Sequence, residues 1–216
     1  MPENSGGVAF VLGQIAAFVM RPNRALESLM THIQVEIDFE SWHSRSIGVH
    51  MRLGDKSSEY QGIKAHGVHT YFERIRTLSF IHGYRDVFIS SDNFNASLEL
   101  RRLLEADHFR VYEIPKKYFE IHMRDLELSH ADFLGNLKLR VGDTSPYDEG
   151  LTLLAQAWML SKCDALLGTF TSNYFQLIYE LSHVRSRGRV LVEDIDRMSY
   201  FPCSSWNQLP WGCEDV

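Results

Sequence analysis

Cysteine is scarce in this chain of 216 residues, which contains three, and no two of them form a Cys-x-x-Cys pair. That absence excludes the common zinc and thiol-redox motifs, and no metal site is expected. Cys163 lies in an apolar run and is expected to be an inert core thiol. Cys203 and Cys213 flank a tail that contains Trp and Pro, and the sequence leaves open whether they form a disulfide or stay free.

A surplus of positive charge is also missing. Lys and Arg together number 22 against 28 Asp and Glu, which gives a formal net charge of −6. No basic field is therefore available to attract nucleic acid, and we expect no nucleic-acid partner. An anionic ligand would have to be held by local groups such as Arg52 and Lys56.

Long hydrophobic runs are absent as well, because no run approaches the roughly 20 apolar residues that a membrane-spanning helix needs. The nearest candidate, residues 8–20, is interrupted by Gly13 and Gln14, and no basic cluster precedes it as in a signal peptide. This pattern favours a helix of the core. We therefore expect a chain without a membrane anchor.

What the chain does contain is an alternation of helical and strand-like segments, with enough apolar residues (44%) for one sizeable core. The alternation predicts an α/β, Rossmann-like fold with a mostly parallel sheet and helices on both faces. We divide the chain into an N-terminal helical segment (1–40), a Rossmann-like domain (41–201) and a C-terminal tail (202–216). The expected strands are 47–51, 87–90, 109–113, 165–167 and 189–192, and the expected helices are 8–20, 23–39, 68–82, 95–106, 149–162 and 173–183, with a loop at 142–148.

Three of these strands run into polar segments, and clefts of open α/β sheets form where the carboxyl ends of the strands meet. A strand followed by a turn rich in Gly, Ser and Thr and then by a helix offers hydroxyls, backbone N–H groups and a positive helix end to an anion. The sequence therefore predicts a ligand that carries phosphate. The polar segments are His50, Arg52, Asp55, Lys56 and Glu59 after the first strand, Ser90–Asn93 after the second, and Gly168–Asn173 after the fourth.

Taken in order, these segments resemble the α1,6-fucosyltransferases, which place fucose on the innermost GlcNAc of N-glycans, and their rhizobial nodulation-factor relatives. The resemblance extends from about Gly13 to Phe201, and its His-x-Arg-x-x-Asp-Lys element gains specificity from the other blocks. The blocks are Ile47-Gly48-Val49-His50-Met51-Arg52-Leu53-Gly54-Asp55-Lys56, then Val87–Asp92, then Leu160–Asp164 with Thr169–Ser172.

The resemblance implies the nucleotide-sugar-binding half of a GT-B-like fold and an enzyme that transfers fucose from GDP-fucose to a GlcNAc of an N-glycan with inversion and without a metal. No cofactor is implied beyond this donor substrate. The implied partners are a nucleotide sugar and a glycan acceptor, and the implied location is the Golgi lumen. The acceptor-facing half of the fold and the membrane anchor are expected to be absent, and a homodimer is left open.

Transfer without a metal requires protein cations and N–H donors to offset the charge that develops on the diphosphate. Arg52 matches the family's essential diphosphate-binding arginine, and a guanidinium fits diphosphate oxygens bidentately. The alternative is a structural pair with a carboxylate such as Asp55. Ser172 matches a phosphate-contacting serine with Thr171 beside it, although a helix N-cap also favours serine.

Three more positions match family site residues. Two-residue alternation places His50 on the same side of its strand as Arg52, where it could contact the nucleotide or belong to the core. Asp92 matches the first of two acidic residues on the nucleotide side, and Asn93 stands in place of the second. Tyr71 falls where the family has a site tyrosine and is equally compatible with a core aromatic.

Inversion also needs a base that takes the proton of the acceptor hydroxyl. Asp55 and Lys56 match the family's Asp-Lys pair, and Glu59 follows it at a slightly shorter spacing than the family's glutamate. The resemblance therefore assigns Glu59, with Lys56, to deprotonate the acceptor and Asp55 to orient its neighbours. The alternative for Asp55 and Lys56 is an exposed ion pair in a turn, and the alternative for Glu59 is a solvated loop glutamate.

Two further positions depart from the family. Leu53 replaces a second arginine, and Gln156 appears at the position of an aspartate that binds the guanine edge. An amide can face a base but lacks the charge-assisted acceptor that favours guanine. The remaining hypotheses are a non-catalytic GDP-sugar-binding homologue, a fucosyltransferase with a different acceptor, and an unrelated Rossmann-like protein.

Overall fold

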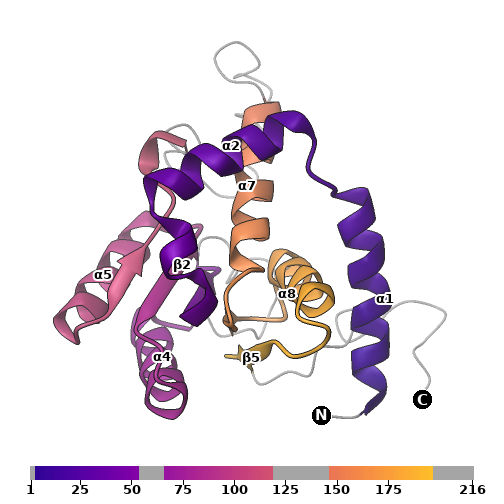
Figure 1. The fold of residues 1–216 in the computed structure, drawn as a ribbon. Coiled ribbons are helices and arrows are strands. Elements are labelled where there is room, and N and C mark those ends of the chain that lie inside the picture. Colours follow the sequence, from indigo (N-terminus) through magenta and orange to yellow (C-terminus); the bar gives the residue numbers. More distant parts are fainter. Residues whose placement is uncertain (1–2, 54–65, 119–145, 197–216) are drawn as a thin grey trace.

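The structure is a computed structural model and describes residues 3–53, 66–118 and 146–196. Helices surround a central sheet (Figure 1). The sheet has five strands, all of whose neighbours are parallel, in the order β3-β2-β1-β4-β5. The predicted α/β, Rossmann-like fold is thereby confirmed. The strands are β1 (Ser46–Met51), β2 (Asp86–Ser91), β3 (Arg110–Tyr112), β4 (Ala165–Gly168) and β5 (Leu191–Asp194).

The strand order creates a topological switch point between β1 and β4. The chain first adds β2 and β3 on one side of β1, and then returns to add β4 and β5 on the other side. Ligands of open α/β sheets bind outside the carboxyl ends of the strands at such a point. The residues that follow Met51 and Gly168 therefore flank the position where a ligand is expected.

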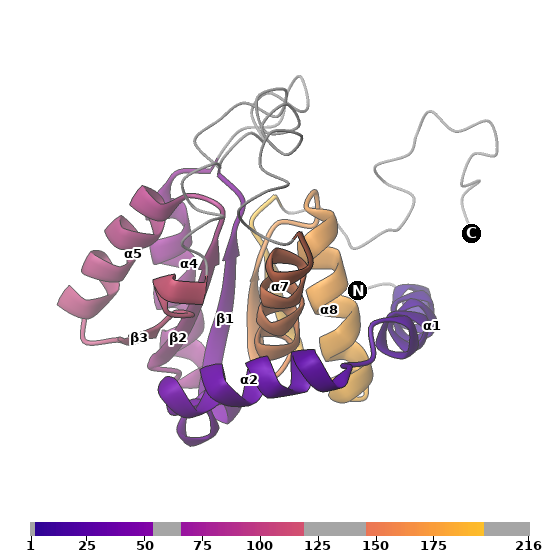
Figure 2. The same cartoon turned by 90° about the horizontal axis from the view of Figure 1, so that it is seen from above.

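Helices cover both faces of the sheet. One face carries α4 (Val68–His82) and α5 (Phe94–Ala106), and the other carries α7 (Pro146–Leu160) and α8 (Asn173–Arg185). Outside this second layer, α2 (Arg24–Glu36) packs on α7, and α1 (Glu3–Val19) packs on α8 at the edge of the molecule (Figure 2). Short 3-10 turns lie at η1 (Phe39–Ser41), η2 (His43–Arg45) and η3 (Lys116–Tyr118).

Local sequence signals set several helix ends. The side chains of Asn23 and Asn93 accept hydrogen bonds from the backbone N–H groups of Leu26 (2.9 Å) and Ala96 (3.0 Å), which caps α2 and α5. Gly83 ends α4 with a φ of 76°, a left-handed conformation that glycine adopts at little cost. The predicted bounds of α4, 68–82, match the structure.

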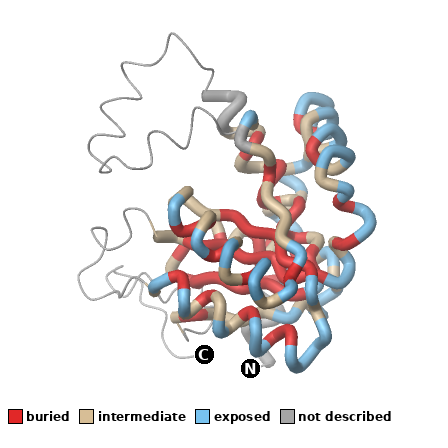
Figure 3. Tube along the Cα trace, turned by 90° about the vertical axis from the view of Figure 1, so that its left-hand side faces the viewer, coloured by how far each residue is buried: buried red, intermediate tan, exposed pale blue. Residues whose placement is uncertain are grey.

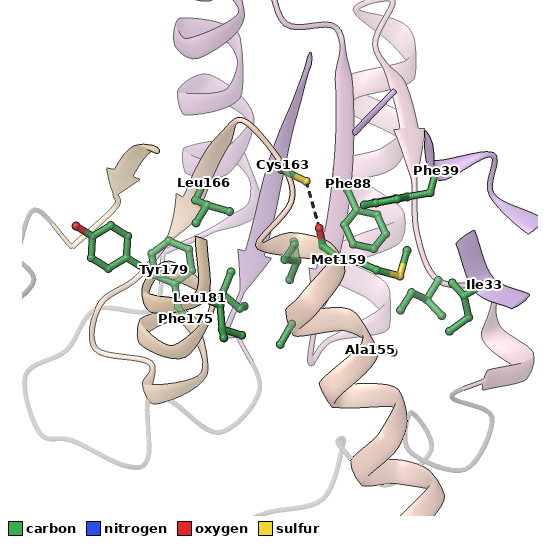
Figure 4. Packing of buried hydrophobic residues seen from close by; sticks show 14 of the residues in the cluster. Ile33, Phe39, Phe88, Ala155, Met159, Cys163, Leu166, Phe175, Tyr179 and Leu181 are labelled. Atoms are coloured by element: carbon green, nitrogen blue, oxygen red, sulfur yellow. Dashed lines mark hydrogen bonds between the residues drawn. The ribbon is translucent and has the colours of Figure 1, made fainter. Parts of the chain in front are cut away.

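Two apolar layers enclose the sheet, and the central strands are buried on both sides (Figure 3). Ile47 and Val49 point into the layer formed with α4 and α5, whereas Phe88 and Leu166 point into the layer formed with α7 and α8. Figure 4 shows that second layer, where the Cys163 thiol lies 3.9 Å from the Met159 carbonyl oxygen. Burial raises the pKa of the Cys163 thiol to about 12, as expected for an inert core cysteine.

Several predicted boundaries differ from the structure, and two of these differences concern the start of α7 and of β5. Residues 146–148 were expected in a loop, but α7 begins at Pro146, because proline is well suited to the first turn of a helix, where its missing N–H costs no hydrogen bond. The last strand begins at Leu191 and not at residue 189, because the turn after α8 extends through Gly188, whose φ is 79°. The shift brings Glu193 and Asp194 into register with the end of β4.

Helix α1 lies at the surface and packs on the core along one side only. Ala9 is fully buried, and Gly13 allows the helix to approach α8 closely. The opposite side exposes apolar side chains, so this helix is less buried than the sequence indicated. No helix within the described ranges is long and apolar enough to cross a membrane. The exposed apolar residues of α1 are Phe10, Val11, Ile15, Phe18 and Val19.

The close contact of α1 with α8 predicts the effect of Gly13→Ala. A Cβ at this position would lie 2.4 Å from the backbone oxygen of Glu180, so the two helices would have to separate. We expect a loss of about 1–3 kcal/mol in the free energy of unfolding, measured by urea denaturation.

Gly150→Ala is the matched control, because nothing lies within 4 Å of its added Cβ in α7. It is expected to stabilise the fold by about 0.5–1 kcal/mol through helix propensity. Equal stability of Gly13→Ala and the wild type would contradict the described packing of α1.

Candidate functional site

The structure brings five of the predicted site residues to the carboxyl edge of the sheet. His50 belongs to β1, and Arg52 follows that strand. Asp92 follows β2, while Thr171 and Ser172 lie between β4 and α8. Since β1 and β4 flank the switch point, these side chains surround the position where a ligand of such a sheet binds.

Asp92 holds the chain where it leaves β1. Its Oδ2 pairs with the Arg52 Nη1 at 2.9 Å, and its Oδ1 accepts a hydrogen bond from the Leu53 backbone N–H at 2.7 Å. The Asp92 side chain is 9% exposed and that of Arg52 is 25% exposed. The aspartate therefore orients a guanidinium that still reaches solvent at the edge of the sheet.

His50 connects the ends of three strands. Its Nδ1 lies 3.3 Å from the Ser90 Oγ on β2, and its Nε2 lies 3.4 Å from the Ser172 Oγ. If the Ser90 hydroxyl donates to Nδ1, Nε2–H donates to Ser172, whose own hydroxyl can then donate to an anion.

Ser172 occupies the N-cap position of α8, but its side chain makes no capping hydrogen bond to the helix. The hydroxyl lies instead beside the His50 ring, as described above. The positive end of α8 is therefore directed at the carboxyl edge without a serine oxygen over its first N–H groups. This arrangement suits an anion better than a simple N-cap would.

Thr171 and the residues before it are held by two aspartates that the sequence reasoning missed. Asp194 Oδ1 accepts the Phe170 backbone N–H at 2.9 Å, and Asp196 Oδ2 accepts the Thr171 hydroxyl. While that bond is made, Thr171 cannot donate to a phosphate, so the contact would fall to Ser172 and to backbone N–H groups. The signal for these aspartates is the Val-Glu-Asp-Ile-Asp segment, which lies at the end of β5 because this strand begins two residues later than predicted.

Tyr71 belongs both to the core and to the site. It is fully buried in α4, and among the described residues its hydroxyl has no hydrogen-bond partner, although the Arg52 backbone lies nearby. Burial, followed by the negative charges of Asp196, Asp92 and Asp194, raises the pKa of Tyr71 well above its ordinary value. The phenol therefore stays protonated and can act as a donor.

Gln156 lies deeper than its predicted role would suggest. It is buried in α7, where its Oε1 accepts a hydrogen bond from the Tyr174 hydroxyl at 3.3 Å, and that hydroxyl also lies 2.7 Å from the Leu153 carbonyl oxygen. The Tyr174 ring in turn packs 5.1 Å from the His50 ring. Tyr174, which the sequence reasoning missed, therefore connects Gln156 to His50.

No protein-family model matches this chain, and no curated protein matches it in sequence. The comparisons thus leave the candidate site to be judged on its own geometry. Within the described ranges, no group of three or more His, Cys, Asp or Glu side chains could hold a metal ion. Asp55, Lys56 and Glu59 lie outside the described residues, and their assignments stay predictions.

The paired Asp92 carboxylate predicts the effect of Asp92→Asn. The variant removes the charge that faces Arg52 while keeping an oxygen for the Leu53 N–H. We expect a loss of about 1.5–3 kcal/mol in the free energy of unfolding, because a hydrogen bond between charged groups at a largely buried position is lost.

The control for this variant is Glu105→Gln, which breaks an exposed pair with Arg101 and should change stability by less than about 0.5 kcal/mol. Urea denaturation of both variants provides the measurement. If Asp92→Asn is as mild as the control, Asp92 does not hold Arg52 in place.

Proposed function

We propose that this chain binds GDP-fucose between the carboxyl ends of β1 and β4 and transfers fucose to a glycan hydroxyl with inversion, as an enzyme of the α1,6-fucosyltransferase type. One observation supports the proposal most. Arg52 follows β1, and the Ser172 hydroxyl and the positive end of α8 follow β4, so all three lie beside the switch point of an all-parallel sheet. These are the donor types that a diphosphate requires.

The chemistry of the donor agrees with this arrangement. When the bond between the sugar C1 and the phosphate breaks, negative charge develops on the departing GDP. A fixed guanidinium, a hydroxyl and helix N–H groups can stabilise that charge because they are already oriented before the reaction. The Asp92 carboxylate holds Arg52, and the His50 ring positions Ser172, so the donors need little reorganisation.

The acceptor is proposed from the sequence resemblance, which indicates a GlcNAc of an N-glycan and a Golgi location. The resemblance also assigns Glu59 and Lys56 to deprotonate the acceptor hydroxyl. Gln156 bears on the nucleotide base, because an amide engaged by Tyr174 is a weaker selector of guanine than a carboxylate. Donor selectivity should therefore be less strict than for a site with an aspartate.

A non-catalytic GDP-sugar-binding protein is the second candidate, and one observation favours it. Asn93 stands where the family has a second acidic residue, and its side chain caps α5 through the Ala96 N–H. Leu53 likewise contributes no charge. GDP binding without release of GDP from GDP-fucose in the presence of a GlcNAc-terminated N-glycopeptide would select this candidate.

The donor-binding proposal is tested by calorimetric titration with GDP, GDP-fucose, GDP-mannose and UDP-GlcNAc in EDTA, which excludes metal-bridged binding. We expect GDP and GDP-fucose to bind, and Arg52→Ala to weaken GDP affinity by at least about 100-fold because charged hydrogen bonds to the diphosphate are lost. Arg52→Lys keeps the charge but not the bidentate geometry, so its GDP affinity should lie between that of the wild type and that of Arg52→Ala.

Arg76→Ala is the control for the loss of an arginine. Arg76 also pairs with an aspartate, Asp107 at 3.2 Å, but it lies exposed on α4. Its removal should leave GDP affinity unchanged. Unchanged affinity in Arg52→Ala, or no binding of any nucleotide by the wild type, would overturn the proposed donor site.

A further inference from the structure

An Asp-His pair lies at the carboxyl edge of the sheet, outside the residues assigned above to the donor. His66, which precedes α4, has its Nε2 2.8 Å from the Asp196 Oδ1, just beyond the end of β5. The aspartate is 7% exposed and the histidine 26% exposed. A buried carboxylate thus supports an imidazole that solvent and ligands can reach.

The second oxygen of Asp196 fixes the position of this pair. Oδ2 accepts the Thr171 hydroxyl, so one carboxylate joins the segment that enters α4 to the segment that enters α8. These helices cover opposite faces of the sheet, and the two segments follow β1 and β4, the strands of the switch point. The imidazole is therefore tied directly to the loop that carries Ser172.

The hydrogen-bond chemistry of the pair determines which ring atom can react. An ionised carboxylate only accepts hydrogen bonds, so the Nε2 of His66 carries a hydrogen and the neutral ring keeps its lone pair on Nδ1. A carboxylate in this position orients a histidine base and stabilises the imidazolium that forms when the base takes a proton.

The surroundings supply a second observation. The buried Tyr71 hydroxyl, which has no partner among the described residues, lies close enough to Asp196, Asp92 and Asp194 for their charges to act on it. Buried donors are nearly always hydrogen-bonded, so this phenol can serve a polar group placed beside it. The dyad and the unpaired phenol therefore belong to one polar region.

We propose that His66, oriented by Asp196, is the base that deprotonates the acceptor hydroxyl, in place of Glu59, to which the resemblance gives that role. This inference rests on the proposed fucosyl transfer. The acceptor O–H bond breaks and its proton passes to Nδ1 of His66. The acceptor oxygen forms a bond to C1 of fucose on the face opposite the phosphate, while the C1–O bond to the phosphate breaks and its electron pair leaves with GDP. The proton passes from the imidazolium to solvent after the product departs.

Other charged groups lie in the same region. The charges of Asp194 and Asp92 reach the Tyr71 hydroxyl, and the Arg52 guanidinium is paired with Asp92. On the adjoining surface Arg74 and Glu193 form a 3.0 Å pair of opposite charges, which cancel at a distance. A protonated imidazole cannot accept the acceptor's proton, so a histidine base gives the activity an acid limb.

The test compares His66→Asn with the wild type by two measurements, GDP affinity by calorimetry and release of GDP from GDP-fucose with a GlcNAc-terminated N-glycopeptide. We expect GDP affinity within about threefold of the wild type and a fall in kcat on the order of 10²–10⁴-fold, together with loss of the acid limb of the pH profile. Asp196→Asn should lower kcat by at least about tenfold, because it removes the charge that stabilises the imidazolium.

His69→Asn is the matched control, since His69 lies exposed on α4 three residues further along the chain. It should keep the wild-type kcat and pH profile, and thermal unfolding of every variant shows whether it is folded. His66→Gln provides a second variant should His66→Asn fail to fold. A folded His66 variant with the wild-type kcat and an unchanged acid limb would overturn this inference and leave the proposed function standing. The same conclusion would follow if Glu59→Gln removed the acid limb and the His66 variants did not.

Two outcomes separate this inference from the proposed function. A wild-type chain that binds GDP but never releases it from GDP-fucose would overturn the His66 inference and the transfer step, and would keep donor binding. A wild-type chain that binds no nucleotide would overturn the proposed function itself. Loss of both GDP affinity and kcat in His66→Asn would show a structural role and would also overturn the assignment of His66 as the base.

Discussion

The central position of β1 is the constraint on which the rest of the structure depends. This strand pairs with β2 on one side and β4 on the other, and all six of its residues are buried. Gly48 permits this, because a Cβ there would lie 3.1 Å from the Cys163 Sγ at the corner between α7 and β4. A strand that is paired along both edges and covered on both faces has a single register, so the point at which the chain leaves the sheet is fixed. The position of Arg52 at the switch point follows from this.

The chain is held in a similar way just beyond each of the two strands of the switch point, β1 and β4. Asp92, from the end of β2, accepts the Leu53 N–H beyond β1, and Asp194, from the end of β5, accepts the Phe170 N–H beyond β4. In each case a carboxylate at the end of the outer strand accepts a hydrogen bond from a backbone N–H just beyond the end of the inner strand. Such bonds to an ionised acceptor are strong, and they fix loops that have no ladder of their own. The residues that carry the Arg52 and Ser172 side chains are therefore held to the ends of their strands.

The sequence predicts those features of the fold that depend on residues close together in the chain. The helix at 68–82 could be bounded from its sequence because Gly67 and Gly83 flank an amphipathic segment, and the first four strands follow from short apolar runs. The sites on β1, β2 and β4 could be anticipated because each lies immediately after its strand. The contact between His66 and Asp196 could not, since 130 positions of sequence separate them and it depends on the register of β5. Tyr174 was likewise missed because its position against Gln156 is set by helix packing.

The balance of charge at the site explains how an acidic chain could hold a diphosphate. The Arg52 charge is matched by Asp92, and Asp194 and Asp196 lie on the other side of the switch point, so the described residues of this region create no cationic field that would attract an anion from a distance. Attraction has to come at short range, from a guanidinium fork, the Ser172 hydroxyl and the first N–H groups of α8. These groups would act through the geometry of their hydrogen bonds more than through net charge. A diphosphate site of the proposed kind would discriminate by the shape of the phosphate group, and it is compatible with a net charge of −6.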